Sequence, residues 1–135
     1  MVNPSKELFC VLFLINSFGS ISHRKKLQKL IFIAKKKFNF DVSFNFMPYL
    51  YGPYSSELSN FIKVLVTDGL ISEKVTTANV TEYSYSLTQL GKTILESMKN
   101  NIDNTSIEKL NQVIKLCSNK TTPEIVSIAK EIMKE

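Results

Sequence analysis

The chain has 135 residues, a net charge of +5 and a hydrophobic fraction of 44%. This length fits a single domain, and this composition excludes an intrinsically disordered chain. No apolar run approaches the ~20 residues that span a bilayer, so we expect no membrane association. The only cysteines are Cys10 and Cys117. They are too few for a disulfide framework, although they allow one bridge, and they favour a reducing, cytoplasmic setting.

The positive charge is concentrated in one segment of the chain. Between His23 and Phe38 there are seven Lys or Arg residues and no acid. The other 10 basic residues stand against all 12 acidic ones, so the remainder carries a net charge of −2. Such a patch predicts a polyanionic partner. The alternative is a solvated helix face that keeps the protein soluble.

The first predicted helix covers residues 4–18. Asn3 and Pro4 are typical of an N-cap and a first helical residue. The apolar run 8–15 predicts that this helix is buried nearly all round, in preference to the core of a signal peptide. After a break, Ser22 is expected to cap the next helix.

The second predicted helix covers residues 23–38. Its core stripe recurs at helical spacing and comprises Leu27, Leu30, Ile31, Ala34 and Phe38. At about 100° per residue, Lys25, Lys29 and Lys36 fall on the side opposite this stripe. Two apolar residues flank the lysines, Phe32 and Ile33. They need a cover, and the C-terminal helices are the simplest candidate, with a second subunit or a ligand as alternatives.

An aromatic-rich segment leads into the third helix. Residues 43–46 alternate as in a short strand, and the proline at 48 confines that strand to an edge or ends it. Gly52 and Pro53 predict a turn. Tyrosines crowd this corner at positions 49, 51 and 54. We interpret the corner as a structural hinge that fixes the start of the third helix, with a tyrosine acid of a small enzyme as the remote alternative.

The third helix is predicted over residues 55–68, with a serine cap at its start and Gly69 as its stop. Residues 70–77 and 81–87 alternate and predict a two-stranded hairpin. Three more helices follow over 89–99, 106–118 and 123–134. Their expected caps include Thr88 and Thr122.

This element order is typical of a winged-helix domain whose first strand is displaced. We therefore predict an α+β, mostly helical fold: a winged helix-turn-helix with a two-stranded wing, a short extra edge strand and two C-terminal helices. The winged-helix domain is expected over residues 1–100. Residues 101–135 are expected to form a C-terminal helical extension packed on that domain or on a second subunit.

Fold and charge together predict a winged-helix DNA-binding protein that regulates transcription. Helix 55–68 would enter a major groove, where Asn60 is suited to adenine, while the wing and the second helix contact the backbone. The expected nucleic-acid-binding residues are Lys25, Lys29, Lys36, Ser56, Asn60, Lys63 and Lys74. Double-stranded DNA is the expected partner, and the C-terminal helices are candidates for a homodimer interface.

A protein-interaction module without DNA binding, such as an antitoxin or adaptor, is the alternative. Helix 55–68 carries Glu57 and Asp68 against Lys63 alone, so it also fits a packed amphipathic helix with a polar outer face. We do not expect an enzyme, because the sequence has one histidine, His23, and no converging catalytic or metal-binding pattern. No cofactor and no metal are expected.

Several segments carry a resemblance to a known family. They are Arg24–Ile33, Tyr51–Leu58, Asp68–Ile71 and Tyr85–Gly91. In this order and spacing they resemble the YwgA-type proteins of bacteria and archaea. They are more distantly similar to the Panacea (SocA-like) domain, which also pairs a KLQKL helix with a YGP turn. The resemblance covers residues 23–98 and implies a winged-helix fold, with antitoxin and adaptor modules among the Panacea relatives.

Overall fold

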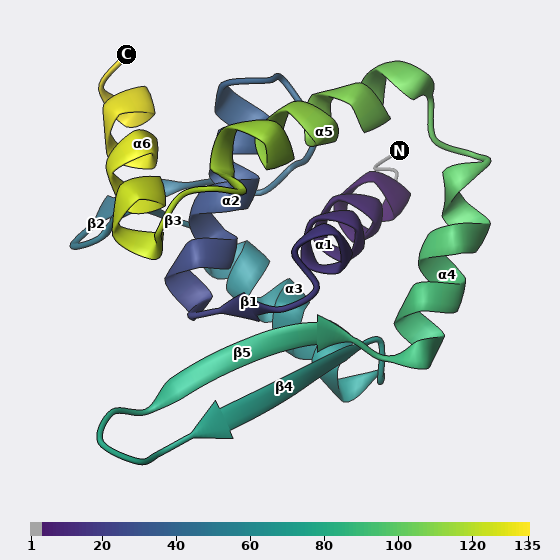
Figure 1. Cartoon of the computed structure of the whole chain (residues 1–135). Coiled ribbons are helices and arrows are strands. Elements are labelled where there is room, and N and C mark those ends of the chain that lie inside the picture. The colour runs from purple at the N-terminus through teal and green to yellow at the C-terminus, as the bar shows by residue number, and fades with distance from the viewer. Residues whose placement is uncertain (1–3) are drawn as a thin grey trace.

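The computed structural model describes residues 4–135 (Figure 1). In this range the helices are α1 (Pro4–Phe18), α2 (Arg24–Lys36), α3 (Ser56–Thr67), α4 (Gln89–Lys99), α5 (Asn104–Cys117) and α6 (Thr122–Lys134). The strands are β1 (Ile21–Ser22), β2 (Met47–Tyr49), β3 (Gly52–Tyr54), β4 (Ile71–Thr76) and β5 (Glu82–Leu87). The predicted α+β, mostly helical class is confirmed. The predicted cap at Asn3 lies outside the described residues.

The strands form two small antiparallel units. One is a three-stranded sheet with the order β1-β5-β4, and the other is the hairpin β2-β3. In Figure 1 the long β4–β5 hairpin extends along one side of the molecule, away from α5 and α6. The helices pack around α1 and α2, each of which supplies a continuous group of buried side chains to the hydrophobic core.

Helix α2 is the centre of the fold. Every residue from Leu27 to Ala34 is buried, which requires other elements on all sides of the helix. Helices α1, α5 and α6 and strands β1 and β3 all contact it. The predicted exposed basic face is therefore wrong in the middle of the helix, where Lys29 is only 2% exposed. Periodicity within one helix could not reveal that α6 would cover this side.

The expected cover over the apolar flank of α2 is confirmed. Helix α6 packs along α2. The loop after α2 adds Phe46, whose ring meets Phe32 edge-on with centroids 5.2 Å apart. Phe32 and Ile33 are consequently buried in the core. The two C-terminal helices thus complete the core within the same chain.

Strand β1 was not predicted. It pairs with β5, with Ile21 opposite Tyr85. Ser22 belongs to this strand, so its predicted role as a helix cap is wrong. His23 takes the cap position with φ 76° and makes no capping side-chain hydrogen bond. Alternation cannot be recognised in a run of two residues, and this explains why the sequence pattern missed the strand.

The predicted strand at 43–46 is wrong, although its side chains alternate between buried and exposed. Side chains satisfy its backbone in place of a partner strand. The Glu7 carboxylate accepts hydrogen bonds from the N–H and hydroxyl of Ser43, and Glu57 accepts one from the N–H of Asn45 at 2.7 Å. The Lys35 ammonium donates to the carbonyl of Phe44. Alternating side-chain types therefore indicate alternating burial, and they do not require that the segment pairs with another strand.

The strand instead lies at β2 and pairs with β3, so the Gly52–Pro53 corner is a hairpin and not a simple turn. Pro48 lies opposite Pro53, where neither residue can donate a ladder hydrogen bond. The chain reverses after Tyr49, and Gly52 adopts φ +95°, a conformation that a side chain disfavours. The corner therefore leads into α3 as an antiparallel pair.

Local signals predicted the second half of the chain well. The β4–β5 hairpin is confirmed, with Ile71 opposite Leu87. Thr88 caps α4, and its hydroxyl accepts a hydrogen bond from the N–H of Gly91 at 3.0 Å. The cap of α6 is Thr121, one residue before the predicted Thr122, and Glu124 completes a capping box with it. The shift moves Pro123 from the first to the second helical position.

One buried polar pair joins α2 to the corner. The side-chain amide of Gln28 donates to the carbonyl of Ser55, and its oxygen accepts from the N–H of Ser55, both at 2.8 Å. Gln28 and Ser55 are buried. Ser55 also caps α3, because its hydroxyl accepts a hydrogen bond from the N–H of Leu58 at 3.1 Å. Gln28 thereby fixes the residue from which α3 begins.

Replacing this amide tests its structural role. We expect Gln28→Ala to lower the free energy of unfolding by about 2 kcal/mol, because it leaves buried backbone groups of Ser55 without partners. Gln112→Ala, at an exposed helical position, is the matched control and should change it by less than about 0.5 kcal/mol. Urea unfolding followed by circular dichroism gives both values. Equal stability of the two variants would contradict the role.

Candidate nucleic-acid interface

The structure divides the seven predicted contact residues among three places. Ser56, Asn60 and Lys63 are exposed on α3, as predicted, and Lys74 is exposed on β4. Lys25 is partly exposed near the start of α2, and Lys36 is exposed at its end. Lys29 is buried between them. Of these places, the outer face of α3 lies near the start of α2, because Lys63 and Arg24 line the same groove.

A small groove connects α2, α3 and the sheet. Its volume is about 60 Å³, and it is lined by Arg24, Gln28, Tyr54, Ser59, Ile62, Lys63, Glu73 and Tyr85. It places Arg24 of the basic helix and Lys63 of α3 on one surface. The basic helix α2 therefore approaches the outer face of α3 at its first residue, Arg24, and not at Lys36.

Arg24 is held by the sheet beneath it. Its Nε–H donates to the hydroxyl of Tyr85 at 3.1 Å, and that hydroxyl donates to Glu73 at 2.8 Å. The guanidinium carbon lies 3.6 Å from the centre of the Tyr83 ring. Burial and the hydrogen bond to Glu73 raise the pKa of Tyr85 to about 12. Sequence analysis did not identify this network, which ties the first turn of α2 to both strands of the β4–β5 hairpin.

Aromatic rings also engage the neighbouring lysines. The Lys25 ammonium lies 4.8 Å from the centre of the Tyr51 ring, and Lys26 lies 5.0 Å from that of Phe18. Such cation–π contacts contribute about 0.5–1 kcal/mol each at exposed sites. Lys35 is engaged as well, because it donates a hydrogen bond to a carbonyl. Lys36, the last residue of α2, is exposed to solvent.

The hollow that combines the most aromatic and cationic residues lies beside the β2–β3 hairpin. We call it the tyrosine pocket. It is lined by Arg24, Lys25, Lys29, Tyr49, Leu50, Tyr51 and Tyr54, and its volume is about 310 Å³. The rings of Tyr49 and Tyr54 lie 5.2 Å apart between centroids. The predicted tyrosine corner is therefore one wall of a pocket, and not packing alone.

Lys29 forms the inner end of the tyrosine pocket. Burial, together with the nearby charges of Lys25 and Lys130, lowers the pKa of its ammonium to about 8. Gly52 makes this close approach possible, because a Cβ there would lie 3.1 Å from Cγ of Lys130 and 3.6 Å from Cε of Lys29. Lys130 comes from α6, so no local pattern around the corner could have predicted this lysine pair.

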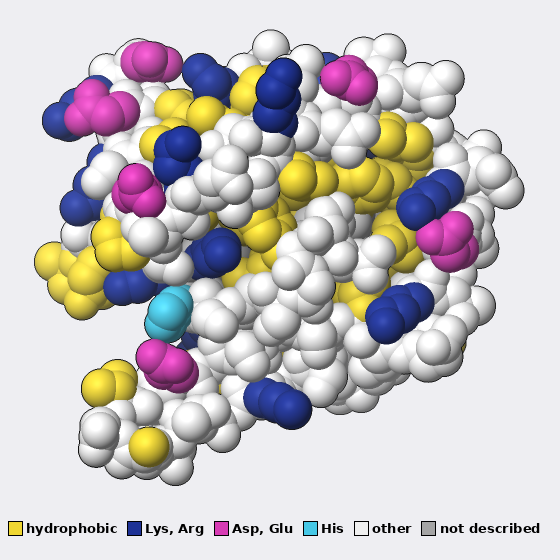
Figure 2. Space-filling model, viewed as in Figure 1, with side chains coloured by type: hydrophobic (Ala, Val, Ile, Leu, Met, Phe, Trp, Pro, Cys, Tyr) yellow, Lys and Arg dark blue, Asp and Glu magenta, His cyan; other side chains and the backbone are white. Residues whose placement is uncertain are grey.

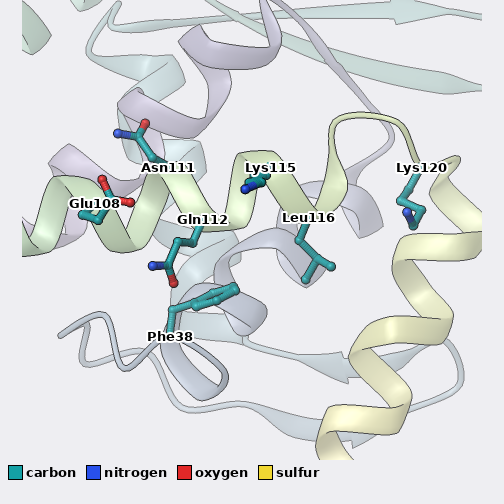
Figure 3. Close-up of a pocket in the computed structure, with 7 residues that line it drawn as sticks. All are labelled: Phe38, Glu108, Asn111, Gln112, Lys115, Leu116 and Lys120. Atoms are coloured by element: carbon teal, nitrogen blue, oxygen red, sulfur yellow. The ribbon is translucent and has the colours of Figure 1, made fainter.

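A larger depression lies along α5, beside Phe38 in the segment that follows α2, and is shown in Figure 3. Its volume is about 640 Å³, and it is lined by Phe38, Glu108, Asn111, Gln112, Lys115, Leu116 and Lys120. The polar side chains come from α5 and the loop that follows it, and all of them are exposed. This depression is a solvated surface and not a site with buried polar groups.

The described residues offer no assembled metal centre and no membrane-crossing element. Within residues 4–135, no group of three His, Cys, Asp or Glu side chains could hold a metal ion. In the same range, no helix combines the length and apolar character needed to cross a membrane. Cys10 and Cys117 are free and buried. Burial raises the pKa of both thiols, that of Cys117 to about 11.

Comparison with known proteins adds one similarity. No family model matches the chain. Over 93 residues the chain is 40% identical to the uncharacterized protein YwgA of Bacillus subtilis (strain 168). The aligned part is 67% of this chain and 55% of YwgA, so the chain spans about half the length of that relative. The finding is a similarity to YwgA over the aligned segment, and the more distant Panacea resemblance stays a prediction.

The buried ammonium of Lys29 predicts a pH-dependent stability. Its pKa of about 8 lies below the ordinary 10.5 that applies in the unfolded chain. The unfolded state therefore binds more protons between these values, and Lys29 contributes a rise in stability with pH through that window. We expect Lys29→Met to be more stable than the wild type near pH 7, because it removes a buried charge. That advantage should shrink as the pH rises from 8 to 10.

Urea unfolding at several pH values measures this difference directly. Comparing the two proteins at each pH cancels the titration of the tyrosines and cysteines that they share. Lys115→Met, at an exposed position of α5, is the matched control and should differ from the wild type by less than about 0.5 kcal/mol. A constant difference between Lys29→Met and the wild type from pH 7 to 10 would show that Lys29 is well solvated.

Proposed function

We propose that this protein is a non-enzymatic, cytoplasmic winged-helix DNA-binding protein that regulates transcription. The observation that carries the proposal is the order β1-β5-β4 of the sheet, with α3 directly before the β4–β5 hairpin. In winged-helix domains the helix before the hairpin enters the major groove, and the hairpin contacts the backbone or minor groove. Strand β1 lies between α1 and α2 and supports the proposal by adding a third strand to the hairpin.

The outward face of α3 supplies the proposed contacts to base edges and, through Lys63, a contact to a phosphate. Ser56, Asn60 and Lys63 are exposed there, and Asn60 offers a donor and an acceptor that match adenine. Lys74 on the β4–β5 hairpin supplies a phosphate contact. Lys25 and Lys36 extend the electrostatic footprint along α2, whereas the buried Lys29 makes no contact with duplex DNA. The C-terminal helices remain a proposed homodimer interface.

Duplex binding at two salt concentrations tests the proposal. We expect the full chain to bind a labelled random-sequence duplex at about 50 mM salt and to lose affinity steeply by about 200 mM, because phosphate contacts release counterions. Lys63→Ala should weaken binding across sequences and reduce the salt slope by about one. Fluorescence anisotropy measures both quantities.

Lys115→Ala removes an exposed lysine far from α3 and serves as the control. It should keep the wild-type salt slope. Absence of binding at low salt would contradict the proposal, since even non-specific affinity is visible there.

The second candidate is a protein-interaction module of the antitoxin or adaptor kind. The exposed apolar tip of the β2–β3 hairpin favours it, because Leu50 is 89% exposed. Its neighbours Met47, Tyr49 and Tyr51 are 64%, 66% and 59% exposed. Apolar side chains clustered at a protruding tip are typical of surfaces that a partner covers. Figure 2 shows hydrophobic side chains gathered at that edge of the molecule.

Affinity capture from native extract distinguishes the two candidates. The wild-type chain and Leu50→Ser serve as baits, because the exposed position should tolerate serine without loss of fold. An interaction module predicts a stoichiometric partner on the wild-type bait that Leu50→Ser loses. Equal recovery on both baits, or no stoichiometric partner, would argue against a module that uses this tip.

A further inference from the structure

The tyrosine pocket carries positive charge that no acidic residue of its lining neutralises. Three cationic side chains line it, Arg24, Lys25 and Lys29, and its lining contains no acid. Arg24 is committed in part, since its guanidinium lies 3.9 Å from Glu73. Within the described residues, no carboxylate lies within 4.0 Å of the ammonium of Lys25 or Lys29. The pocket therefore complements an anion.

The same pocket presents flat rings to solvent. Tyr49 is 66% exposed and Tyr51 is 59% exposed, at the tip of a hairpin where Leu50 is almost fully exposed. Most of the surface that lines the pocket is apolar, although cations surround it. A ligand that only carried charge would leave these rings uncovered. The rings and the cations are complementary to a ligand with a planar, weakly polar ring beside an anionic group.

The position of Lys29 favours a phosphate within reach of the pocket. Its ammonium is held near Lys25 and Lys130 by the close approach at Gly52. Three neighbouring cations repel one another, and a bound anion relieves that repulsion. A bound anion thus neutralises these cations in place of an acidic residue of the protein.

We propose that the tyrosine pocket binds one unpaired nucleotide unit, with its base stacked on the exposed tyrosines and its phosphate between Lys25 and Lys29. Aromatic side chains beside a cationic groove are the elements with which proteins hold single-stranded nucleic acid. The volume of about 310 Å³ lies at the lower end of small-ligand sites, as a single nucleotide requires. The unit can come from a single strand or from a free nucleotide.

This site is separate from the proposed duplex interface and does not rest on it. The base contacts to a duplex use the outer face of α3, whereas the nucleotide site uses the β2–β3 hairpin and the start of α2. Lys25 is the one basic residue that belongs both to the duplex footprint and to the nucleotide site. The two surfaces adjoin at Arg24 and Tyr54, which line both the tyrosine pocket and the small groove that reaches Lys63. A strand emerging from a duplex on α3 would meet the pocket next.

Binding of a labelled ten-residue oligothymidylate to the full chain tests the proposal by fluorescence anisotropy. We expect Tyr51→Ala and Lys25→Ala each to weaken binding at least fivefold, because a stacked base and a phosphate contact are lost. The matched controls are Leu90→Ala and Lys115→Ala, which remove an exposed apolar and an exposed basic side chain elsewhere. They should change the affinity less than twofold. Circular dichroism melts confirm that all four variants fold.

Competitors then identify the source of the unit. Thymidine monophosphate that displaces the oligonucleotide, where thymidine does not, assigns the pocket to a free nucleotide. Displacement only by unlabelled oligonucleotide assigns it to a single strand, and either result supports the proposal. A peptide of alternating Asp and Phe that binds in place of any nucleotide would overturn it in favour of a protein partner.

Two further results overturn the inference without touching the duplex proposal. One is the absence of oligothymidylate binding at low salt. The other is single-strand binding that Lys63→Ala abolishes and Tyr51→Ala leaves unchanged, which would place the strand on α3. Conversely, loss of duplex binding in Lys63→Ala with oligothymidylate binding left intact would show that the duplex and the single strand bind at different surfaces. The two proposals therefore stand or fall on different variants.

Discussion

A helix that is buried on every side must find partners for each polar side chain that it carries, and α2 carries two in its buried middle. Gln28 finds both of its partners in the backbone of Ser55, at the start of α3. A buried amide without such partners would cost about 1–3 kcal/mol, so the corner and the helix are constrained together. The position of α3, and of the hairpin before it, depends on this pair of hydrogen bonds.

Lys29 meets the same constraint by a different route. Its aliphatic stem lies in the core, and its ammonium reaches the inner end of the tyrosine pocket, beside Gly52. The ammonium keeps no acidic partner among the described residues, and its pKa falls to about 8. Burial of a lysine without an acid costs stability, and such a cost is typical of sites that serve a ligand. The glycine, the two lysines and the tyrosines thus form one arrangement.

Local chemistry predicted the parts of this fold that depend on neighbours in sequence. Thr88 as a cap, Gly69 as a helix stop and the alternation of the β4–β5 hairpin identified their elements within a residue or two. The parts that depend on distant segments could not be read in the same way. The burial of Lys29 requires α6, and β1 is only two residues long and exists because β5 returns beside it.

The candidate site shows the same division. The exposure of Ser56, Asn60 and Lys63 follows from helical periodicity and was predicted. Arg24 was counted as one more positive charge, whereas its guanidinium is stacked on Tyr83 and bonded to Tyr85. That network needs the register of β5 against β4, which no pattern near Arg24 contains. The crowding of tyrosines at the corner was predicted, but the cationic side chains that turn the corner into a pocket come from α2, which is distant in sequence.

The packing of α6 on α2 and β3 also determines when the core can be completed during translation. Helix α2 is translated early, yet the helix that covers it is translated long after. Until then Phe32, Ile33 and the stem of Lys29 lack their cover, and a nascent chain with exposed apolar surface is prone to association. Contacts of such sequence separation also slow folding. The centre of this molecule is therefore begun with α2 and completed only when α6 has left the ribosome.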